Sequence, residues 1–142
     1  MSLRPTLLLI DDEERILRSL AMMFRGNYQL HTTTDPQEAL AIVERETVHV
    51  IVSDQRMPLM RGAELLRRVR EKSPNTMRIL LTGYSELEAV VASVNEGEIF
   101  RFVSKPWAND ELSTTVARAV VAARASAAAE AKAAAEAGTE PA

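Results

Sequence analysis

The sequence predicts a doubly wound α/β fold, in which five strands form one parallel sheet with helices on both faces. Short, nearly continuous apolar runs, typical of strands that are buried on both faces, alternate five times with longer segments of helical apolar spacing. Polar residues follow several of these runs directly, where a parallel sheet of this kind has its binding crevice. Together these observations favour a ligand site at the carboxyl ends of the strands.

The apolar runs place the strands. Four of the runs are aliphatic or β-branched and nearly continuous, whereas the second alternates between apolar and polar residues and is the weakest of the five. The expected strands cover residues 6–10, 28–32, 48–53, 78–82 and 99–104.

A helical segment follows each expected strand. The second begins at Asp35 and Pro36, because aspartate caps a helix and proline fits its first turn. The third ends at Ser73 and Pro74, and the fourth closes near Gly97. The apolar residues that share a helical face are Ile16, Leu17, Leu20 and Met23, then Ala39, Leu40 and Val43, then Leu65, Leu66 and Val69, then Leu87, Val90, Val91 and Val94, and finally Leu112, Val116, Ala119 and Val120.

The last part of the chain differs in composition. The stretch "RASAAAEAKAAAEAG" is mostly alanine, the best helix former, so we expect it to extend the fifth helix as a semi-rigid spacer that frays at its end. It has too little apolar content for a second core. We therefore interpret 1–123 as one domain and 124–142 as a helical extension or linker.

Composition excludes several classes of function. The chain has 142 residues and a net charge of -3, so it lacks the basic surface expected of a protein that binds nucleic acid directly. It has no cysteine, which excludes disulfides, zinc–thiolate sites and thiol catalysis. No signal peptide is visible, and no apolar run approaches the roughly 18 residues that span a membrane. We expect a cytoplasmic protein.

Five polar residues lie at the ends of the expected strands or directly after them and form a candidate site: Asp11, Asp12, Asp54, Thr82 and Lys105. Carboxylates that lie close together raise one another's pKa unless a cation compensates their charge. Oxygen ligands of this kind suit Mg²⁺, which keeps room for phosphate oxygens. A lysine and a hydroxyl group suit a phosphoryl group, and one carboxylate could be a nucleophile that forms an acyl phosphate.

Each of these motifs also has a plain structural interpretation. Asp11 and Asp12, with the two glutamates that follow, could simply favour a helix N-terminus by capping and by attraction to the helix dipole. Thr82 with its glycine, and Lys105 with Pro106, could be ordinary turns at strand ends. Only their joint placement favours a chemical site.

The order of these motifs resembles the receiver domain of two-component response regulators. The resemblance rests on the acidic pair, "DQRMP" at 54–58, Thr82 and "KP" at 105–106, and it covers residues 6–122. It implies a flavodoxin-like (βα)5 fold. It also implies that Asp54 accepts a phosphoryl group, with Mg²⁺, from a sensor histidine kinase or a phosphotransfer protein.

The resemblance assigns roles to further residues. It implies Mg²⁺ ligands at Asp11, Asp12, Asp54 and the backbone carbonyl of Arg56, with Asp12 as a direct ligand. It also implies that Thr82 is the switch hydroxyl, Lys105 the phosphate-binding lysine, Phe102 the rotating aromatic residue and Pro106 a turn or cis proline.

The resemblance implies a switch at the surface of the fourth helix, fifth strand and fifth helix. Phosphorylation would change the preferred partner of this surface, which by family analogy is also the surface of a homodimer. The output would be a separate partner or a C-terminal domain of a longer protein, joined through the helical linker.

Some positions depart from the commonest receiver pattern. Gly83 stands where many receivers have alanine, and we expect it to loosen the loop or widen access to the phosphate. Arg56 and Tyr84 occupy variable positions near the phosphate, where we expect their bulk to slow hydrolysis. With "LLTGYSE" and "NEGEIFRFVSKPW", the chain is similar to receivers joined to HD-type phosphodiesterase domains or to hydrogenase-type regulators.

Two other functions remain open at the level of sequence. One is a Mg²⁺-dependent phosphohydrolase with an aspartyl phosphate, although such enzymes of the HAD type usually have a DxD pair at the first strand and here the two aspartates are adjacent. The other is an interaction module with a vestigial site. A receiver would not turn over an external substrate. His31 and His49 are expected to be structural or surface residues and not phosphoacceptors.

Overall fold

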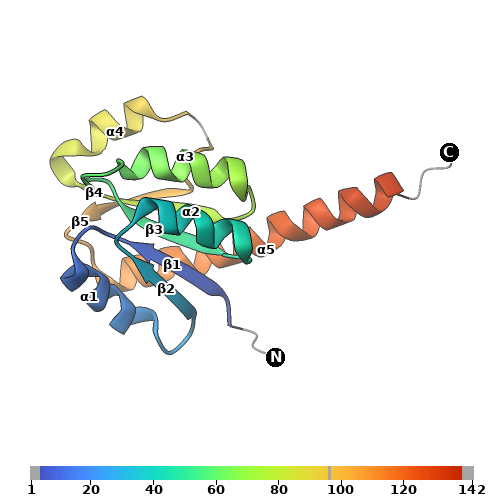
Figure 1. The fold of residues 1–142 in the computed structure, drawn as a ribbon, viewed down its shortest axis with the longest axis horizontal. Helices are drawn as coiled ribbons and strands as arrows, with labels where there is room; N and C mark the ends of the chain where they lie inside the picture. Colours follow the sequence, from blue (N-terminus) through green and yellow to red (C-terminus); the bar gives the residue numbers. More distant parts are fainter. Residues whose placement is uncertain (1–3, 96, 139–142) are drawn as a thin grey trace.

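A five-stranded parallel sheet is the centre of the computed structural model, which describes residues 4–95 and 97–138 (Figure 1). Its strand order is β2-β1-β3-β4-β5. The order reverses at β1, so the crevice of a doubly wound sheet lies at the carboxyl ends of β1 and β3. The strands are β1 Thr6–Ile10, β2 Gln29–Thr33, β3 Val50–Asp54, β4 Met77–Gly83 and β5 Arg101–Lys105.

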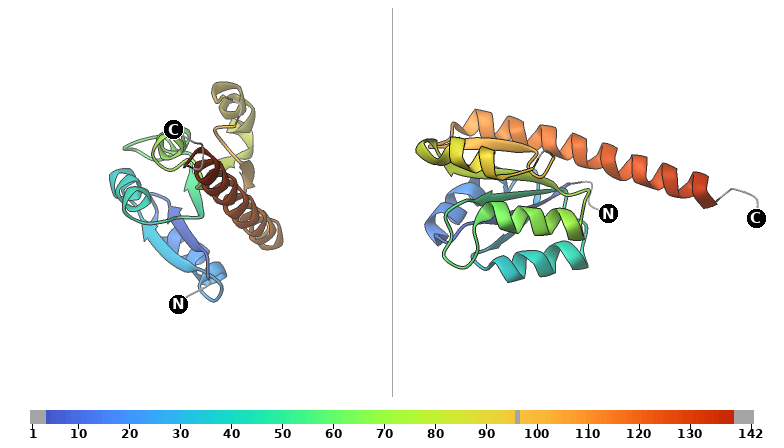
Figure 2. Two further views of the ribbon diagram at one scale, coloured as in Figure 1. Left: turned by 90° about the vertical axis from the view of Figure 1, so that its right-hand side faces the viewer. Right: turned by 90° about the horizontal axis from the view of Figure 1, so that it is seen from above.

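Helices cover both faces of this sheet (Figures 1 and 2). One apolar core lies between the sheet and helices α1 and α5, and a second lies between the sheet and α2, α3 and α4. The predicted fold class is therefore confirmed. The helices are α1 Glu14–Phe24, α2 Pro36–Arg45, α3 Gly62–Lys72, α4 Leu87–Ser93 and α5 Asn109–Gly138, with a 3-10 turn, η1, at Tyr84–Glu86.

The continuous apolar runs of the sequence are explained by these two cores. In β1, Leu7 and Leu9 belong to the core under α1 and α5, whereas Leu8 and Ile10 belong to the opposite core. All five residues of β1 are buried. Because both faces of the strand are covered, alternation between apolar and polar residues is not required.

The strands extend further toward the site than the apolar pattern predicts. β3 includes Asp54 and β5 includes Lys105, because Asp54 pairs with Leu81 and Lys105 pairs with Gly83 in the ladder. Backbone pairing does not depend on side-chain polarity, so the ladder continues past the last apolar residue. These two site residues are thereby fixed as parts of the sheet.

The buried residues of helix α4 differ from those that the sequence predicts. Val90 is buried against the core, but Val91 is 46% exposed and Val94 lies beyond the helix as its C-cap. The expectation that all three share one buried face is wrong. Adjacent residues point about 100° apart on a helix, and a helix this short covers the sheet with a narrow stripe only.

Helix α5 continues well beyond the sheet (Figure 2). Asn75, in the connection between α3 and β4, contacts it twice: Ser126 Oγ donates to Asn75 Oδ1 at 2.5 Å, and Asn75 Nδ2 donates to Glu130 Oε2 at 3.1 Å. Residues 139–142, where fraying is predicted, lie outside the described residues. Among the residues described, no helix combines the length and apolar character that crossing a lipid bilayer requires.

Helix α3 packs closely against the end of β3. A Cβ atom at Gly62 would overlap the backbone oxygen of Asp54 and lie 2.8 Å from Leu80 Cδ1. Since backbone atoms cannot move aside cheaply, the absence of a side chain at this position lets α3 approach Asp54.

We expect Gly62→Ala to destabilise the domain by about 2 kcal/mol or more, because the added methyl group forces α3 away from β3. Urea denaturation of the two proteins measures this loss. Gly26→Ala is the control, since nothing lies within 4 Å of the added methyl group, and it should change stability little. Equal stability of the Gly62 and Gly26 variants would contradict the close packing.

Candidate functional site

Three carboxylates meet at the carboxyl ends of β1 and β3. Asp11 and Asp12 follow β1, Asp54 ends β3, and one oxygen from each lies within 4.8 Å of the others. Asp11 and Asp54 are buried, at 2% and 3% exposure, whereas Asp12 is exposed. The three aspartates that the sequence predicts as site residues are thus brought together at the carboxyl ends of the strands.

Lys105 brings a positive charge to the same point. Its ammonium group forms an ion pair with Asp54 Oδ1, although Lys105 ends β5, two strands away from β3. The Asp54 side chain is nearly inaccessible, whereas the Lys105 side chain is about a third exposed. Lys105 compensates part of the negative charge that the three carboxylates accumulate.

The surroundings of the two buried carboxylates raise their pKa values. Burial raises the pKa of Asp11 to about 6 from 3.8; the nearby Asp54 charge adds to this, while a hydrogen bond from the Glu13 backbone N–H opposes it. Burial also raises the pKa of Asp54, against the lowering effect of Lys105. A bound cation would favour the charged form of both carboxylates, which burial and the neighbouring aspartate charge disfavour.

Two buried polar atoms in the described part of the chain have no hydrogen-bond partner, Asp11 Oδ2 and Thr82 Oγ1. Asp11 Oδ1 accepts from the Glu13 N–H at 2.9 Å in the turn before α1, so only its second oxygen is without a partner. Thr82 lies in β4 with its hydroxyl unpaired. The unpaired carboxylate oxygen of Asp11 could bind Mg²⁺. The unpaired hydroxyl group of Thr82 could donate a hydrogen bond to a phosphoryl oxygen.

The aromatic and proline positions lie beside this cluster. Phe102 pairs with Leu80 in the ladder and packs, half-buried, against the core that includes Val90 of α4. The Lys105–Pro106 peptide bond is cis, one of the two alternatives that the sequence suggested for Pro106. Phe102 is thus a half-buried residue of the same strand as Lys105, three positions before it.

The outer rim contains a contact that the sequence did not predict. Arg56 Nε lies 2.9 Å from Glu86 Oε1, which joins the β3–α3 loop to η1. A Cβ atom at Gly83 would lie 3.4 Å from the same Glu86 oxygen, and Tyr84 is 82% exposed. Glu86 ends the stretch "LLTGYSE", but the sequence offers no reason to pair it with Arg56, because that contact depends on the 3-10 turn η1.

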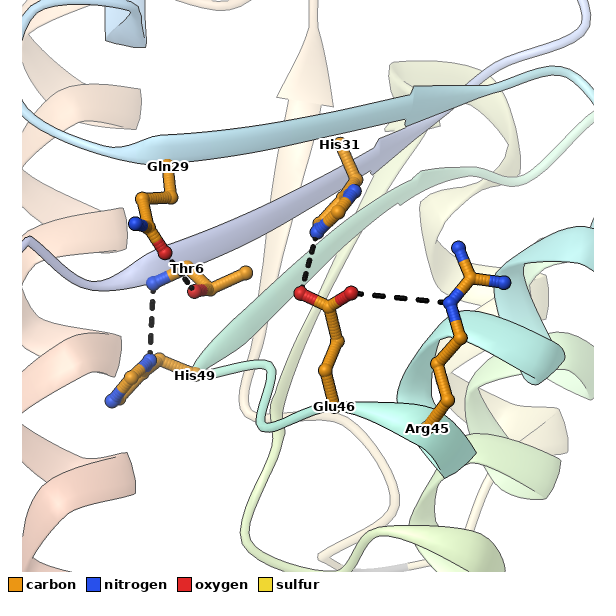
Figure 3. Close-up of polar contacts among 6 residues, drawn as sticks. All are labelled: Thr6, Gln29, His31, Arg45, Glu46 and His49. Atoms are coloured by element: carbon orange, nitrogen blue, oxygen red, sulfur yellow. Dashed lines mark hydrogen bonds and ion pairs between the residues drawn. The ribbon is translucent and has the colours of Figure 1, made fainter.

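The two histidines lie apart from this cluster: His49 directly precedes β3 and His31 lies midway along β2 (Figure 3). His49 Nδ1 accepts from the Thr6 N–H at 3.1 Å at the start of β1, and His31 Nε2 lies 2.7 Å from Glu46 Oε1. Burial lowers the pKa of His49, and Arg124 adds to this effect. Both histidines have structural partners and lie apart from the carboxylate cluster.

Comparison with known sequences agrees with the family that the motifs resemble. Residues 7–117 match the family described as the response regulator receiver domain. The chain is 39% identical over 120 residues to the hydrogenase transcriptional regulatory protein HoxA of Bradyrhizobium diazoefficiens, covering 84% of this chain and 25% of that protein. HoxA of Cupriavidus necator is 40% identical over 117 residues, covering 82% and 24%. The chain thus spans about a quarter of the length of these relatives.

Among solved structures, the fold is similar to the signal receiver domain of an HD domain-containing protein from Pseudomonas fluorescens Pf-5. The TM-score is 0.81 at 35% identity, with 89% of this chain and 93% of that chain covered. Hydrogenase regulators and an HD-associated receiver are the two subgroups to which the sequence was expected to be similar.

We expect Asp11→Asn to stabilise the metal-free protein at pH 7 by roughly 1–3 kcal/mol, since the shift from 3.8 to about 6 costs about 1.4 kcal/mol per unit. The folded state holds the Asp11 proton more tightly than the unfolded state, so this cost is fully present above pH 6 and disappears below about pH 4. Urea denaturation with a chelator at pH 7 and pH 4 measures the difference between the two proteins.

Asp35→Asn is the control, since Asp35 lies outside the cluster and caps α2 through the Gln37 N–H. It should lower stability slightly at pH 7. A pH-independent effect of Asp11→Asn would contradict the electrostatic account.

Proposed function

The chain belongs to the response regulator receiver family, and on that premise we propose that Asp54 takes a phosphoryl group from the phosphohistidine of a sensor kinase or phosphotransfer protein. As a member of this family, the domain is a phosphoacceptor of two-component signalling. One observation carries the assignment to Asp54: its carboxylate is buried, ion-paired with Lys105 and within 4.8 Å of two further carboxylates.

The transfer is a substitution at phosphorus. An Asp54 oxygen attacks the phosphorus atom, the bond from phosphorus to the histidine nitrogen breaks, and that nitrogen leaves with the electron pair and takes up a proton. Lys105 moves its contact from the carboxylate to a phosphoryl oxygen, and the unpaired Thr82 hydroxyl donates a hydrogen bond to another.

The acidic cluster would hold Mg²⁺ during this step. The proposed ligands are Asp11, through its unpartnered Oδ2, Asp12, Asp54 and the backbone carbonyl of Arg56. When bound, the ion supplies positive charge that offsets the carboxylates and the phosphoryl oxygens.

Phosphorylation would then shift the population of a second surface. Thr82 moves toward the phosphoryl group, and Phe102, a half-buried residue of β5, fills the space that it leaves. The surface of α4, β5 and α5 would change its partner, and by family analogy it would also form a homodimer. The exposed Val91 of α4 lies on this surface.

The output belongs to the proposal as well. Because the chain spans about a quarter of the HoxA proteins that it resembles, an output domain in a longer protein fits this receiver. Helix α5, which continues beyond the sheet, would connect the two. A cytoplasmic location stays a prediction.

We expect incubation with a small phosphodonor and Mg²⁺ to add a single phosphate to the wild type and none to Asp54→Asn. Removal of Mg²⁺ by a chelator should abolish the adduct in the wild type. Intact-mass spectrometry measures all three outcomes. Asp35→Asn, which removes an aspartate at the start of α2, is the matched control and should still accept one phosphate.

Two results would overturn this proposal. An absence of adduct with every donor would leave only an interaction module. Release of many phosphates per chain would instead identify a phosphohydrolase, since a receiver releases one for each labelling event.

We expect simultaneous replacement of Arg56 and Tyr84 by alanine to shorten the lifetime of the phosphorylated form roughly tenfold, or about 1.4 kcal/mol in barrier height. Their side chains stand at the rim, where bulk hinders an in-line water molecule, and the Arg56–Glu86 ion pair holds one of them in place. Loss of radiolabel over time measures the decay. Arg67→Ala, on the outer side of α3, should leave it unchanged, and unchanged decay in the double variant would contradict this role.

A further inference from the structure

The loop between β3 and α3 is closed by one buried side chain, Gln55. This glutamine directly follows the phosphoacceptor position and is 6% exposed. Its backbone oxygen accepts from the Gly62 N–H at 3.0 Å, and its side-chain Oε1 accepts from the Ala63 N–H at 2.8 Å. Both ends of the loop 56–61 are therefore joined through a single residue.

These two hydrogen bonds replace an ordinary helix cap. The first amides of a helix have no partner within it and need an external acceptor. Arg61, at the N-cap of α3, makes no side-chain capping bond. Gln55 supplies the acceptors from the other end of the loop, so the start of α3 and the end of β3 are tied together.

Two anchors on either side of Arg56 fix the part of the loop next to Gln55. The Gln55 N–H donates to the Leu81 carbonyl of β4 at 3.0 Å, and Met57 is buried in the core under α2 and α3. Between these two anchors lies Arg56, whose side chain turns outward to Glu86. The backbone of Arg56 is thus held from both sides, while its side chain is exposed.

We propose that Gln55 is a positioning residue for the metal site, acting through its bond to the Ala63 N–H to hold the loop that presents the backbone carbonyl of Arg56. It contacts neither the phosphoryl group nor the ion. The inference rests on the proposed function, because that carbonyl is a proposed Mg²⁺ ligand.

The chemistry of the position favours glutamine. An apolar residue of similar length would leave the Ala63 N–H without an acceptor. Glutamate would keep the acceptor but add a buried negative charge beside three carboxylates. Asparagine is one methylene group shorter and would not reach the helix from the present backbone.

The decisive variant is Gln55→Met, which keeps the length of the side chain and removes the acceptor. We expect calorimetric titration with MgCl₂ alone to show affinity reduced roughly 10–100-fold, as for other residues that orient metal ligands. Hydrogen exchange of the Ala63 amide, followed by NMR in the metal-free protein, should become faster. Gln55→Glu should restore the slow exchange, because a carboxylate oxygen can accept the same bond.

Two controls separate positioning from general loss of stability. Val69→Ala truncates a fully buried residue of α3 away from the loop, so it should destabilise the protein without changing Mg²⁺ affinity. Gln29→Met removes a glutamine that accepts from Thr6 Oγ1 at the opposite edge of the sheet, and it should leave Mg²⁺ affinity unchanged (Figure 3).

The outcomes distinguish the two proposals. If the wild type binds no Mg²⁺, the proposed metal site itself fails. If the wild type binds Mg²⁺ and Gln55→Met binds it equally well, the role of Gln55 is overturned while the metal site stands. If Gln55→Met does not fold, Gln55→Asn decides: weaker Mg²⁺ binding supports the role, and unchanged binding overturns it.

Discussion

The mutual repulsion of three carboxylates is the constraint on which the site depends. Asp11 and Asp54 are almost completely buried, and Asp12 places a further oxygen within 4.8 Å of theirs. Such an arrangement persists only because the packed sheet holds the backbones in place and Lys105 brings a positive charge to Asp54. Burial raises the pKa values of the two buried aspartates, and the charge of a neighbouring aspartate adds to the rise in each case. The fold therefore maintains a cluster that is incomplete without a cation.

The packing of α3 against β3 also holds the site residues in place. Gly62 allows α3 to touch the backbone of Asp54, and Gln55 joins the end of the strand to the start of the helix. A loop that carries a proposed metal ligand is thus fixed by main-chain contacts and one buried amide. On the outer side of this loop the exposed Arg56 forms an ion pair with Glu86 of η1.

The carboxyl and amino ends of the strands differ in how well their buried polar groups are paired. At the carboxyl edge, groups lack partners, as Asp11 Oδ2 and Thr82 Oγ1 do. At the amino edge, shown in Figure 3, Thr6 and His49 satisfy each other, and Asn75 fastens α5 where it leaves the sheet. Unsatisfied buried polar groups are costly unless a ligand completes them, and among the described residues both such side-chain atoms lie at the end of the sheet where we propose the site.

The sequence by itself determined the fold class and the main residues of the cluster. The run that ends at Asp11 and the run that ends near Asp54 both predict buried parallel strands, and parallel strands bring their carboxyl ends to one edge. Tertiary structure alone decided that Asp11 Oδ2 is buried without a partner, that Val91 is exposed, and that Glu86 and Gln55 contact the loop and the start of α3. The physical reason is that periodicity reports which face of an element is apolar. It does not report which side chains from separate elements meet, because that depends on the register and the turns that only the packed chain fixes.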